Sequence, residues 1–421
     1  MSLSAAAQDL VDLESARKEY ATLRDAGLKL DLTRGKPSPE QLDLSAAILS
    51  LPGANDYVSA EGIDTRNYGG VEGLIEIREI FGKLLGIPAQ QLLAAGNASL
   101  NLMHDVLVHA LLTPVPGAER RWVDEEEVVF LCPSPGYDRH FALTERFGIR
   151  MVPVALTGEG PDMDEVERLV ASDARIKAIW CVPKYSNPTG ETYSDEVVRR
   201  LAAMPTAAPD FRILWDNAYA VHDLTDEQVP LLNVLEACAE AGNPDRVFVF
   251  ASTSKITLAG AGVAFFGSSA ANVAWLNKVL VKQTIGPDKV NHLRHVRFFG
   301  DADGVLAHMQ KHRALLEPRF EAVYEVLEAE LTGIATWTRP KGGYFVSLEV
   351  PDGCAAEVVR LAKEAGIALT PAGSAFPYGK DPRDHQIRLA PSFPSVDEVR
   401  EAMRAVAVCV KLAVAEQAAA K

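Results

Sequence analysis

The segment Val247-Phe-Val-Phe-Ala-Ser-Thr-Ser-Lys-Ile-Thr-Leu-Ala-Gly-Ala-Gly262 contains an apolar run, a lysine and a glycine-rich loop in direct succession. Its first residues, Val247 to Phe250, are β-branched or aromatic, which predicts a buried strand. Lys255 follows where this strand opens into a polar loop, and partial burial there lowers the pKa of an ammonium group. A neutral amine can attack a carbonyl and form a Schiff base, so Lys255 is a candidate nucleophile. The alternative is a lysine that merely ends a strand.

Between residues 120 and 270, predicted strands and helices alternate, and polar residues follow each strand. The predicted strands are 128–132, 150–156, 178–182, 211–215 and 247–250, with helices at 138–147 and 163–172 between the first of them. Solid apolar strands that alternate with helices predict an α/β fold with a mainly parallel sheet flanked by helices on both faces. Ligands of such sheets bind at the carboxyl ends of the strands, so we expect the functional site at that edge.

The pattern changes after Gly300, where helical periodicity and short strands predict a second, smaller α+β domain. The elements expected there are helices at 303–330, 355–365 and 396–415 and short strands within 337–349, 367–369 and 386–389. An amphipathic helix over residues 8–26, stopped by Gly27, is expected to join them. We therefore predict a large domain of residues 51–300 and a small domain of residues 1–50 plus 301–421.

The composition excludes several classes of partner. The chain has 421 residues and a net charge of −15 without a basic run, which argues against nucleic acid or an acidic membrane surface as a partner. No apolar stretch approaches the length of a membrane span, and no signal peptide is recognised. The five cysteines form no Cys-x-x-Cys pair, so neither a metal site nor a disulfide framework is expected, and a cytoplasmic location is the default.

Several polar residues at strand ends suit an aldehyde cofactor held by Lys255. If this cofactor is pyridoxal 5′-phosphate, its ring nitrogen needs a carboxylate to stay protonated, and Asp216, directly after a buried strand, can supply it. Tyr219 and Asn187 are placed to hydrogen-bond the ring 3′-oxygen, and Tyr137 is placed to stack on the ring. The alternative for Asp216 is a solvated loop aspartate.

The cofactor phosphate would need backbone amides and hydroxyl groups. A turn of small residues before a helix leaves N–H groups free and directs the positive end of the helix dipole outward, which favours an anion. A plain N-cap is the alternative. The residues expected at the phosphate are Gly96, Asn97, Ala98, Ser99, Ser252 and Ser254.

Together these motifs form an ordered set that covers nearly the whole chain. The set is Tyr68 with its glycine-rich turn, Gly96 with its helix, Pro-x-Pro-Gly-Tyr137, Asn187-Pro-Thr-Gly, Asp216-x-Ala-Tyr219, Ser-x-Ser-Lys255 and Ile-Arg388. It resembles class I/II aminotransferases of pyridoxal phosphate fold type I, with a seven-stranded type of sheet. Segments such as Asp-Leu-Thr-Arg-Gly-Lys-Pro and Pro-Gly-Tyr-Asp-Arg-His most resemble a divergent bacterial branch of aspartate aminotransferases.

The resemblance implies roles for individual residues. Lys255 would form the Schiff base and move a proton between the substrate Cα and the cofactor, while Asp216 pairs with the ring nitrogen. Arg388 would bind the substrate α-carboxylate through its planar donors, with a backbone contact from Gly35. Tyr68 would reach the phosphate in the neighbouring subunit, which implies a homodimer with shared active sites.

The chain departs from the family pattern in one place. The family usually carries a phosphate-binding arginine shortly after the lysine, whereas residues 259–263 are Ala-Gly-Ala-Gly-Val. Either helix-start amides and hydroxyls carry the phosphate alone, or a basic residue from elsewhere replaces the arginine. For the side chain of a dicarboxylic substrate we predict Arg139 as the second cation. The competing cations are Arg34, Lys36, Arg294 and Arg297.

The predicted function is transamination between aspartate or glutamate and a 2-oxo acid, oxaloacetate or 2-oxoglutarate. The alternatives are an aminotransferase for kynurenine or alanine, or a pyridoxal phosphate-dependent C–S lyase. An effector-binding module of a MocR-type regulator is disfavoured by the negative charge. His308 and His312 have i, i+4 spacing but lack the glutamate of a zinc protease motif, so we interpret them as a solvated helix face.

Overall fold

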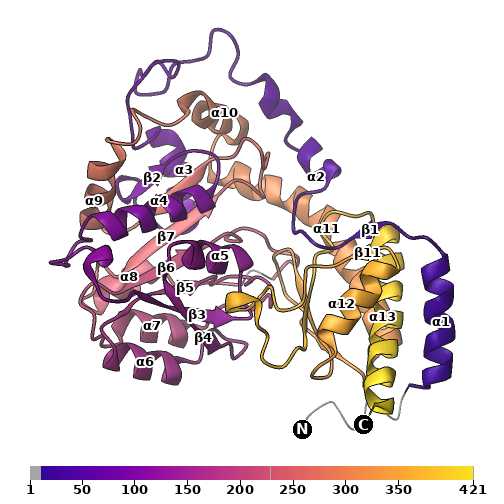
Figure 1. The fold of residues 1–421 in the computed structure, drawn as a ribbon. Coiled ribbons are helices and arrows are strands. Elements are labelled where there is room, and N and C mark those ends of the chain that lie inside the picture. Colours follow the sequence, from indigo (N-terminus) through magenta and orange to yellow (C-terminus); the bar gives the residue numbers. More distant parts are fainter. Residues whose placement is uncertain (1–10, 228, 421) are drawn as a thin grey trace.

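The structure, a computed structural model, describes residues 11–227 and 229–420. Its larger part is built on a seven-stranded sheet of order β2-β8-β7-β6-β5-β3-β4 (Figure 1). The strands are β2 (Leu92–Ala94), β3 (Val129–Ser134), β4 (Arg150–Ala155), β5 (Ile176–Cys181), β6 (Arg212–Asp216), β7 (Val247–Ser252) and β8 (Ala264–Gly267). β8 runs antiparallel to β2 and β7, and the other neighbours pair in parallel. The prediction of a mainly parallel sheet is confirmed.

Alternate residues of the strands enter two hydrophobic cores, one on each face of the sheet. Along β7, Val247 and Val249 belong to one core, whereas Phe248 and Phe250 belong to the other, because successive side chains of a strand point to opposite faces. The first core is covered by α3 (Ile75–Leu85), α6 (Met163–Ser172), α7 (Asp195–Ala203), α8 (Val234–Glu240) and α10 (Lys289–Phe299), and the second by α4 (Ser99–Leu112), α5 (Asp138–Arg146) and α9 (Ala270–Leu280). Helices therefore flank both faces, as predicted.

The smaller part contains a three-stranded antiparallel sheet of order β12-β10-β9 and the parallel pair β1–β11. Its elements are α1 (Leu13–Asp25), β1 (Leu30–Asp31), α2 (Pro39–Asp43), α11 (Ala302–Leu331), β9 (Thr336–Trp337), β10 (Val346–Glu349), α12 (Ala355–Glu364), β11 (Ile367–Ala368), β12 (Gln386–Leu389) and α13 (Val396–Ala419). α1 packs along α13, so the first and last helices that the structure describes share one region (Figure 1). The domain limits at 50/51 and 300/301 stay a prediction.

Several elements differ from the sequence-based expectation. α1 begins at Leu13, where Asp12 accepts a hydrogen bond from the Ser15 amide, and the predicted residues 8–10 lie outside the described residues. The strands β2 and β8 and the helices α9 and α10 were not predicted. In the part of the chain that the structure describes, no helix combines the length and the hydropathy of a membrane span.

The interpretation of His308 and His312 as a solvated helix face is wrong. Their side chains on α11 are 5% and 1% exposed. The cause is tertiary: Gln41 of α2 lies over this helix face, with its Nε2 3.0 Å from His312 Nδ1. The Nε2 atoms of the two rings lie 3.1 Å apart, so the histidines are packed against each other.

Candidate active site

A cavity of about 520 Å³ lies at the carboxyl ends of the parallel strands, where the sequence predicted a site. Loops after β3, β5, β6 and β7 meet there with β12 and with the segment that follows β1. Most of the predicted site residues line it: Gly35, Ser99, Tyr137, Arg139, Asn187, Asp216, Tyr219, Lys255 and Arg388. Residues from distant parts of the chain thus converge on one space, which is the arrangement that a small-molecule site requires.

Lys255 projects into this cavity from the loop after β7. Its Nζ lies 5.0 Å from the centre of the Tyr219 ring. Burial lowers the pKa of Lys255, and the negative charge of Asp216 opposes this shift. A lysine with a lowered pKa is more readily available as a neutral amine, which suits a nucleophile or a general base.

Asp216, the last residue of β6, has one occupied and one free carboxylate oxygen. Its Oδ2 lies 3.0 Å from His140 Nε2, and the His140 ring stacks on Trp180 at 4.2 Å between centroids. Its Oδ1 is buried and, within residues 11–227 and 229–420, meets no hydrogen-bond donor. An unpaired buried acceptor beside a cavity fits the ring N–H of a pyridinium. Sequence analysis missed His140, although it stands three residues after Tyr137 on the same helix.

Arg388 reaches the cavity from β12 and is only 8% exposed. Its Nη1 donates to Asp138 Oδ1 at 3.0 Å, and its Nη2 donates to Thr370 Oγ1 at 3.1 Å and to the Thr33 carbonyl at 3.3 Å. Its Nε is buried without an acceptor among the described residues. The guanidinium is therefore fixed in place with donor capacity remaining, which suits a carboxylate ligand. The sequence did not identify Asp138, Thr33 or Thr370.

Gly35 lies beside this guanidinium for a steric reason. A Cβ atom at this position would come within 2.4 Å of the Phe345 ring. The same ring lies 5.0 Å from the Arg388 guanidinium carbon. Any larger residue at position 35 would clash with Phe345, which lines the cavity, so this position requires glycine.

The predicted phosphate end of the cavity is the start of α4. Ser99 lines the cavity, Ala98 is the N-cap residue, and no side-chain hydrogen bond caps this helix. Its first amides are thus available to an anion. Nearby, Ser252 Oγ donates to Ser254 Oγ at 3.1 Å. Gly96 accepts a hydrogen bond from the Ala264 amide through its carbonyl oxygen.

The side chain of Asn97, predicted to face the phosphate, is instead hydrogen-bonded to the protein backbone. Its Oδ1 accepts a hydrogen bond from the Gly262 amide at 2.6 Å. Asn291 Nδ2 donates to the carbonyls of Ala261 and Gly262 at 3.1 and 2.8 Å. Two asparagines therefore hold the loop in which related enzymes usually carry the phosphate-binding arginine, and this loop contributes no cation.

Tyr68 is 83% exposed on the surface of this chain. The loop that carries it is held by Lys289, whose Nζ donates to the carbonyls of Asn67 and Gly69 at 2.8 and 2.6 Å. Tyr68 and the exposed Ile285 border the same shallow surface depression.

The candidate cations for a second carboxylate fall into two groups. Arg294 donates to the Leu51 carbonyl, and Arg297 pairs with Asp56 at 2.8 Å, so both are engaged with the segment before α3. The other group, which lines the cavity with Lys255, is Arg34, Lys36 and Arg139. These three have no ion pair with any residue that the structure describes.

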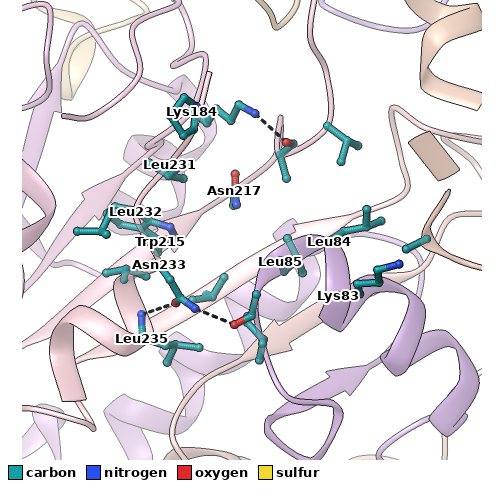
Figure 2. A pocket seen from close by; sticks show the side chains of 18 of the residues that line it. Lys83, Leu84, Leu85, Lys184, Trp215, Asn217, Leu231, Leu232, Asn233 and Leu235 are labelled. Carbon is teal, nitrogen blue, oxygen red and sulfur yellow. Dashed lines mark hydrogen bonds between the residues drawn. The ribbon is translucent and has the colours of Figure 1, made fainter. Parts of the chain in front are cut away.

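A second cavity, of about 640 Å³, lies on the other side of the end of β6 (Figure 2). Trp215 and Asn217 line it, whereas Asp216 and Ala218 line the first cavity, as the alternation of side chains along a strand requires. Figure 2 shows leucine side chains around most of this space and Lys184 at its edge, where its Nζ donates to the Ala220 carbonyl at 3.1 Å. The charged residues that line this larger cavity pair with one another, Lys184 with Asp223 at 3.4 Å and Lys83 with Asp303 at 3.6 Å.

Comparisons with known proteins agree with the fold and identify the family. A family model described as aspartate amino-transferase matches residues 1–421. A protein of Mycolicibacterium smegmatis named as an aminotransferase is 61% identical over 411 residues, 97% of this chain and 96% of that protein. An aspartate aminotransferase of Corynebacterium glutamicum is 52% identical over 405 residues, 96% of this chain and 94% of that protein.

Solved structures give the same result. The crystal structure of an aspartate transaminase from Corynebacterium glutamicum superposes with a TM-score of 0.96 at 50% identity, covering 99% of both chains. An alpha-aminoadipate aminotransferase from Thermus thermophilus shares the fold, with a TM-score of 0.76 at 22% identity and 95% coverage of both chains. The chain therefore belongs to the aspartate aminotransferase family, within the aminotransferases of fold type I, which generally use pyridoxal phosphate.

Proposed function

We propose that this aminotransferase binds pyridoxal 5′-phosphate through Lys255 and moves an amino group between aspartate or glutamate and a 2-oxo acid. The chemistry of the cavity supports the cofactor. Asp216 offers a buried, unpaired carboxylate oxygen to a ring N–H, and the uncapped start of α4 offers amides to a phosphate. Tyr137 and Tyr219 supply aromatic and hydroxyl groups between these two ends.

When bound, the cofactor supplies an electron sink that makes the Cα–H bond of an attached amino acid acidic. Lys255, as a neutral amine, would take this proton from Cα, and its ammonium form would donate it to the former aldehyde carbon of the cofactor. Arg388 holds the α-carboxylate through its remaining donors and so orients the Cα–H bond towards Lys255. His140 fixes the orientation of the Asp216 carboxylate through the 3.0 Å hydrogen bond.

The observation that carries the substrate proposal is the set of cations around Lys255. Arg388 has its own carboxylate partner, Asp138, whereas Arg34, Lys36 and Arg139 line the same cavity without an ion pair among the described residues. All three are exposed to solvent, and Lys36 also lies over the Phe393 ring. Their shared positive charge favours a side-chain carboxylate over a neutral side chain in this cavity. Arg139 is our choice for the direct contact because it adjoins Tyr137 and Asp138 on α5.

A homodimer with shared sites completes the proposal. Tyr68 extends from the surface next to exposed apolar residues such as Ile285. An exposed tyrosine held on an ordered loop is suited to reach an anion in a neighbouring subunit. In the dimer, Tyr68 would then contact the phosphate of the partner's cofactor. This contact would partly compensate for the missing arginine at residues 259–263.

The experiment uses the absorbance of the cofactor-loaded enzyme. Aspartate, glutamate, alanine and kynurenine are added separately, and the cofactor band is followed. We expect aspartate and glutamate to abolish the band and 2-oxoglutarate to restore it. A response to kynurenine or alanine alone would contradict the proposed substrate class, and a band that no amino acid changes would contradict the proposed cofactor chemistry.

A further inference from the structure

Two consecutive peptide carbonyls, those of Lys255 and Ile256, accept hydrogen bonds from buried side chains that lie outside the cavity. Tyr344 Oη donates to the Lys255 carbonyl at 3.3 Å, and His222 Nε2 lies 3.3 Å from the same oxygen. His308 Nε2 lies 2.9 Å from the Ile256 carbonyl. We call the side chains of this network the polar clamp: Gln41, His222, His308, His312 and Tyr344.

Gln41 fixes the direction of hydrogen bonding in the polar clamp. Its Oε1 accepts from the Ser38 amide at 3.0 Å, as part of the capping box of α2, so its Nε2 must face the other way. Nε2 donates to Tyr344 Oη at 3.0 Å and lies 3.0 Å from His312 Nδ1. Because an amide nitrogen only donates, His312 Nδ1 must accept, and the proton of this ring lies on Nε2.

The histidines of the clamp are neutral donors. A carbonyl oxygen only accepts, so His222 and His308 also carry their protons on Nε2. Burial lowers the pKa of His222 to about 3 and of His312 to about 4. The clamp therefore contacts residues 255 and 256 with neutral side chains. These side chains add no net charge beside the cavity.

The clamp brings together segments that are far apart in the chain. Gln41 lies on α2, His308 and His312 lie on α11, and Tyr344 precedes β10, whereas His222 follows β6. Gln41 and Tyr344 are fully buried. α11 is the long helix that runs from beside the seven-stranded sheet to α13 (Figure 1). The backbone of Lys255 is therefore attached to both parts of the molecule.

The turn that carries Lys255 depends on these contacts. The amides of Ile256 and Thr257 both donate to the Thr253 carbonyl at 2.9 Å, which closes a single turn. Such an isolated turn is marginal without further support, because it has few hydrogen bonds of its own. The carbonyls on its open side are the ones that the polar clamp occupies.

We propose that the polar clamp consists of positioning residues that hold the turn of Lys255 and thereby align its amine for proton transfer. The proposal rests on the proposed role of Lys255. An amine that takes a proton from one atom and returns it to another has to keep its backbone fixed while its side chain moves. None of the clamp side chains touches substrate in this assignment, so substrate binding is unaffected while turnover depends on the clamp.

The test combines kinetics with hydrogen exchange on the full-length chain. Tyr344→Phe removes one hydroxyl, His308→Phe removes a donor, and His308→Gln restores a donor. We expect the Phe variants to lower kcat about 10- to 100-fold while KM for aspartate stays within roughly threefold. Exchange at the Ile256 and Thr257 amides should become about tenfold faster or more, with or without cofactor. His308→Gln should recover most of both effects.

His385→Gln is the matched control, because His385 is a buried histidine that pairs with Asp381 far from Lys255. It should leave both kcat and exchange at residues 256 and 257 unchanged. Unchanged exchange and turnover in Tyr344→Phe and His308→Phe would overturn the proposal. Faster exchange spread evenly over the chain would overturn it too, because the residues would then only stabilise the fold. Exchange is measured without turnover, so a failure of the Lys255 assignment itself would leave the exchange result standing.

Discussion

Two cavities flank the end of β6, and the smaller one contains the residues proposed to carry out the reaction. The first, of about 520 Å³, contains Lys255, Asp216 and Arg388, and the second, of about 640 Å³, is lined mostly by aliphatic residues, with two lysines and two aspartates at its edge. Both contain a lysine with a lowered pKa, because partial loss of solvent disfavours the charge of Lys255 and of Lys184 alike. Lys184 is occupied by the Ala220 carbonyl and by Asp223 at 3.4 Å. Convergent polar groups, and not volume or a shifted pKa alone, distinguish the site.

The largest expected effect compares the two lysines. Lys255→Ala should lower kcat by about 10⁴-fold or more, since nucleophile and general base are lost together. Lys184→Ala should leave kcat within roughly threefold, because its amine does not face the first cavity. Steady-state rates with aspartate and 2-oxoglutarate measure both. A larger loss of kcat in Lys184→Ala than in Lys255→Ala would show that the reaction takes place in the second cavity.

The next effect compares two neighbouring residues on opposite sides of β6. Asp216→Asn removes the charge that faces the first cavity and should lower kcat/KM by about 10²–10³-fold. Asn217→Ala changes only the second cavity and should have little effect. Near-equal losses of kcat/KM in the two variants would show that activity depends on the conformation of the strand end and not on the Asp216 carboxylate.

Arg139→Ala should separate substrates by charge. Loss of a charge-assisted hydrogen bond of about 1.5–3 kcal/mol should lower kcat/KM for aspartate about 10- to 100-fold. Alanine, which has no side-chain carboxylate, should lose much less. The ratio of the two kcat/KM values is the measurement, and equal losses would transfer the role to Arg34 or Lys36.

Asp138→Asn tests the one carboxylate that competes for Arg388. Asp138 Oδ1 lies 3.0 Å from Arg388 Nη1 and places a negative charge beside the expected α-carboxylate. Its neutralisation should lower KM for amino acids by about three- to tenfold, as expected for a charge pair between a buried guanidinium and a half-buried carboxylate. A higher KM would mean that Asp138 mainly orients the guanidinium.

The smallest effect concerns stability, since buried histidines surround Lys255. Burial lowers the pKa of His222 to about 3 and of His292, His295 and His312 to about 4. An unfolded histidine titrates near 6.5, so the unfolded chain binds these protons first as the pH falls. The free energy of unfolding should therefore decrease from about pH 6.5 towards pH 4. Urea unfolding measures this slope, and His312→Gln should flatten it; an unchanged slope would contradict the burial argument.

Much of the fold followed from local sequence patterns. The buried strand at Val247 and its neighbours are apolar runs bounded by polar loops, and such runs mark parallel strands without tertiary information. The residues that line the cavity were found because they follow those strands directly. Asp216 and Lys255 belong to this group.

The parts that were missed depend on contacts between distant segments. β2 and β8 have only three and four residues, too few for a periodic signal. His308 and His312 look like a polar helix face, and their burial arises from α2, which no local pattern of α11 reveals. The same holds for Asp138 and Thr370, whose role comes from the approach of Arg388.

The central claim is that the cofactor is attached to Lys255 in the smaller cavity. The cofactor-loaded enzyme is treated with borohydride, which fixes the pyridoxyl group on the lysine that carries it, and the digested chain is analysed by mass spectrometry. The account predicts the added mass on the peptide that contains Lys255. The same mass on the peptide that contains Lys184, or on any other lysine, would contradict it.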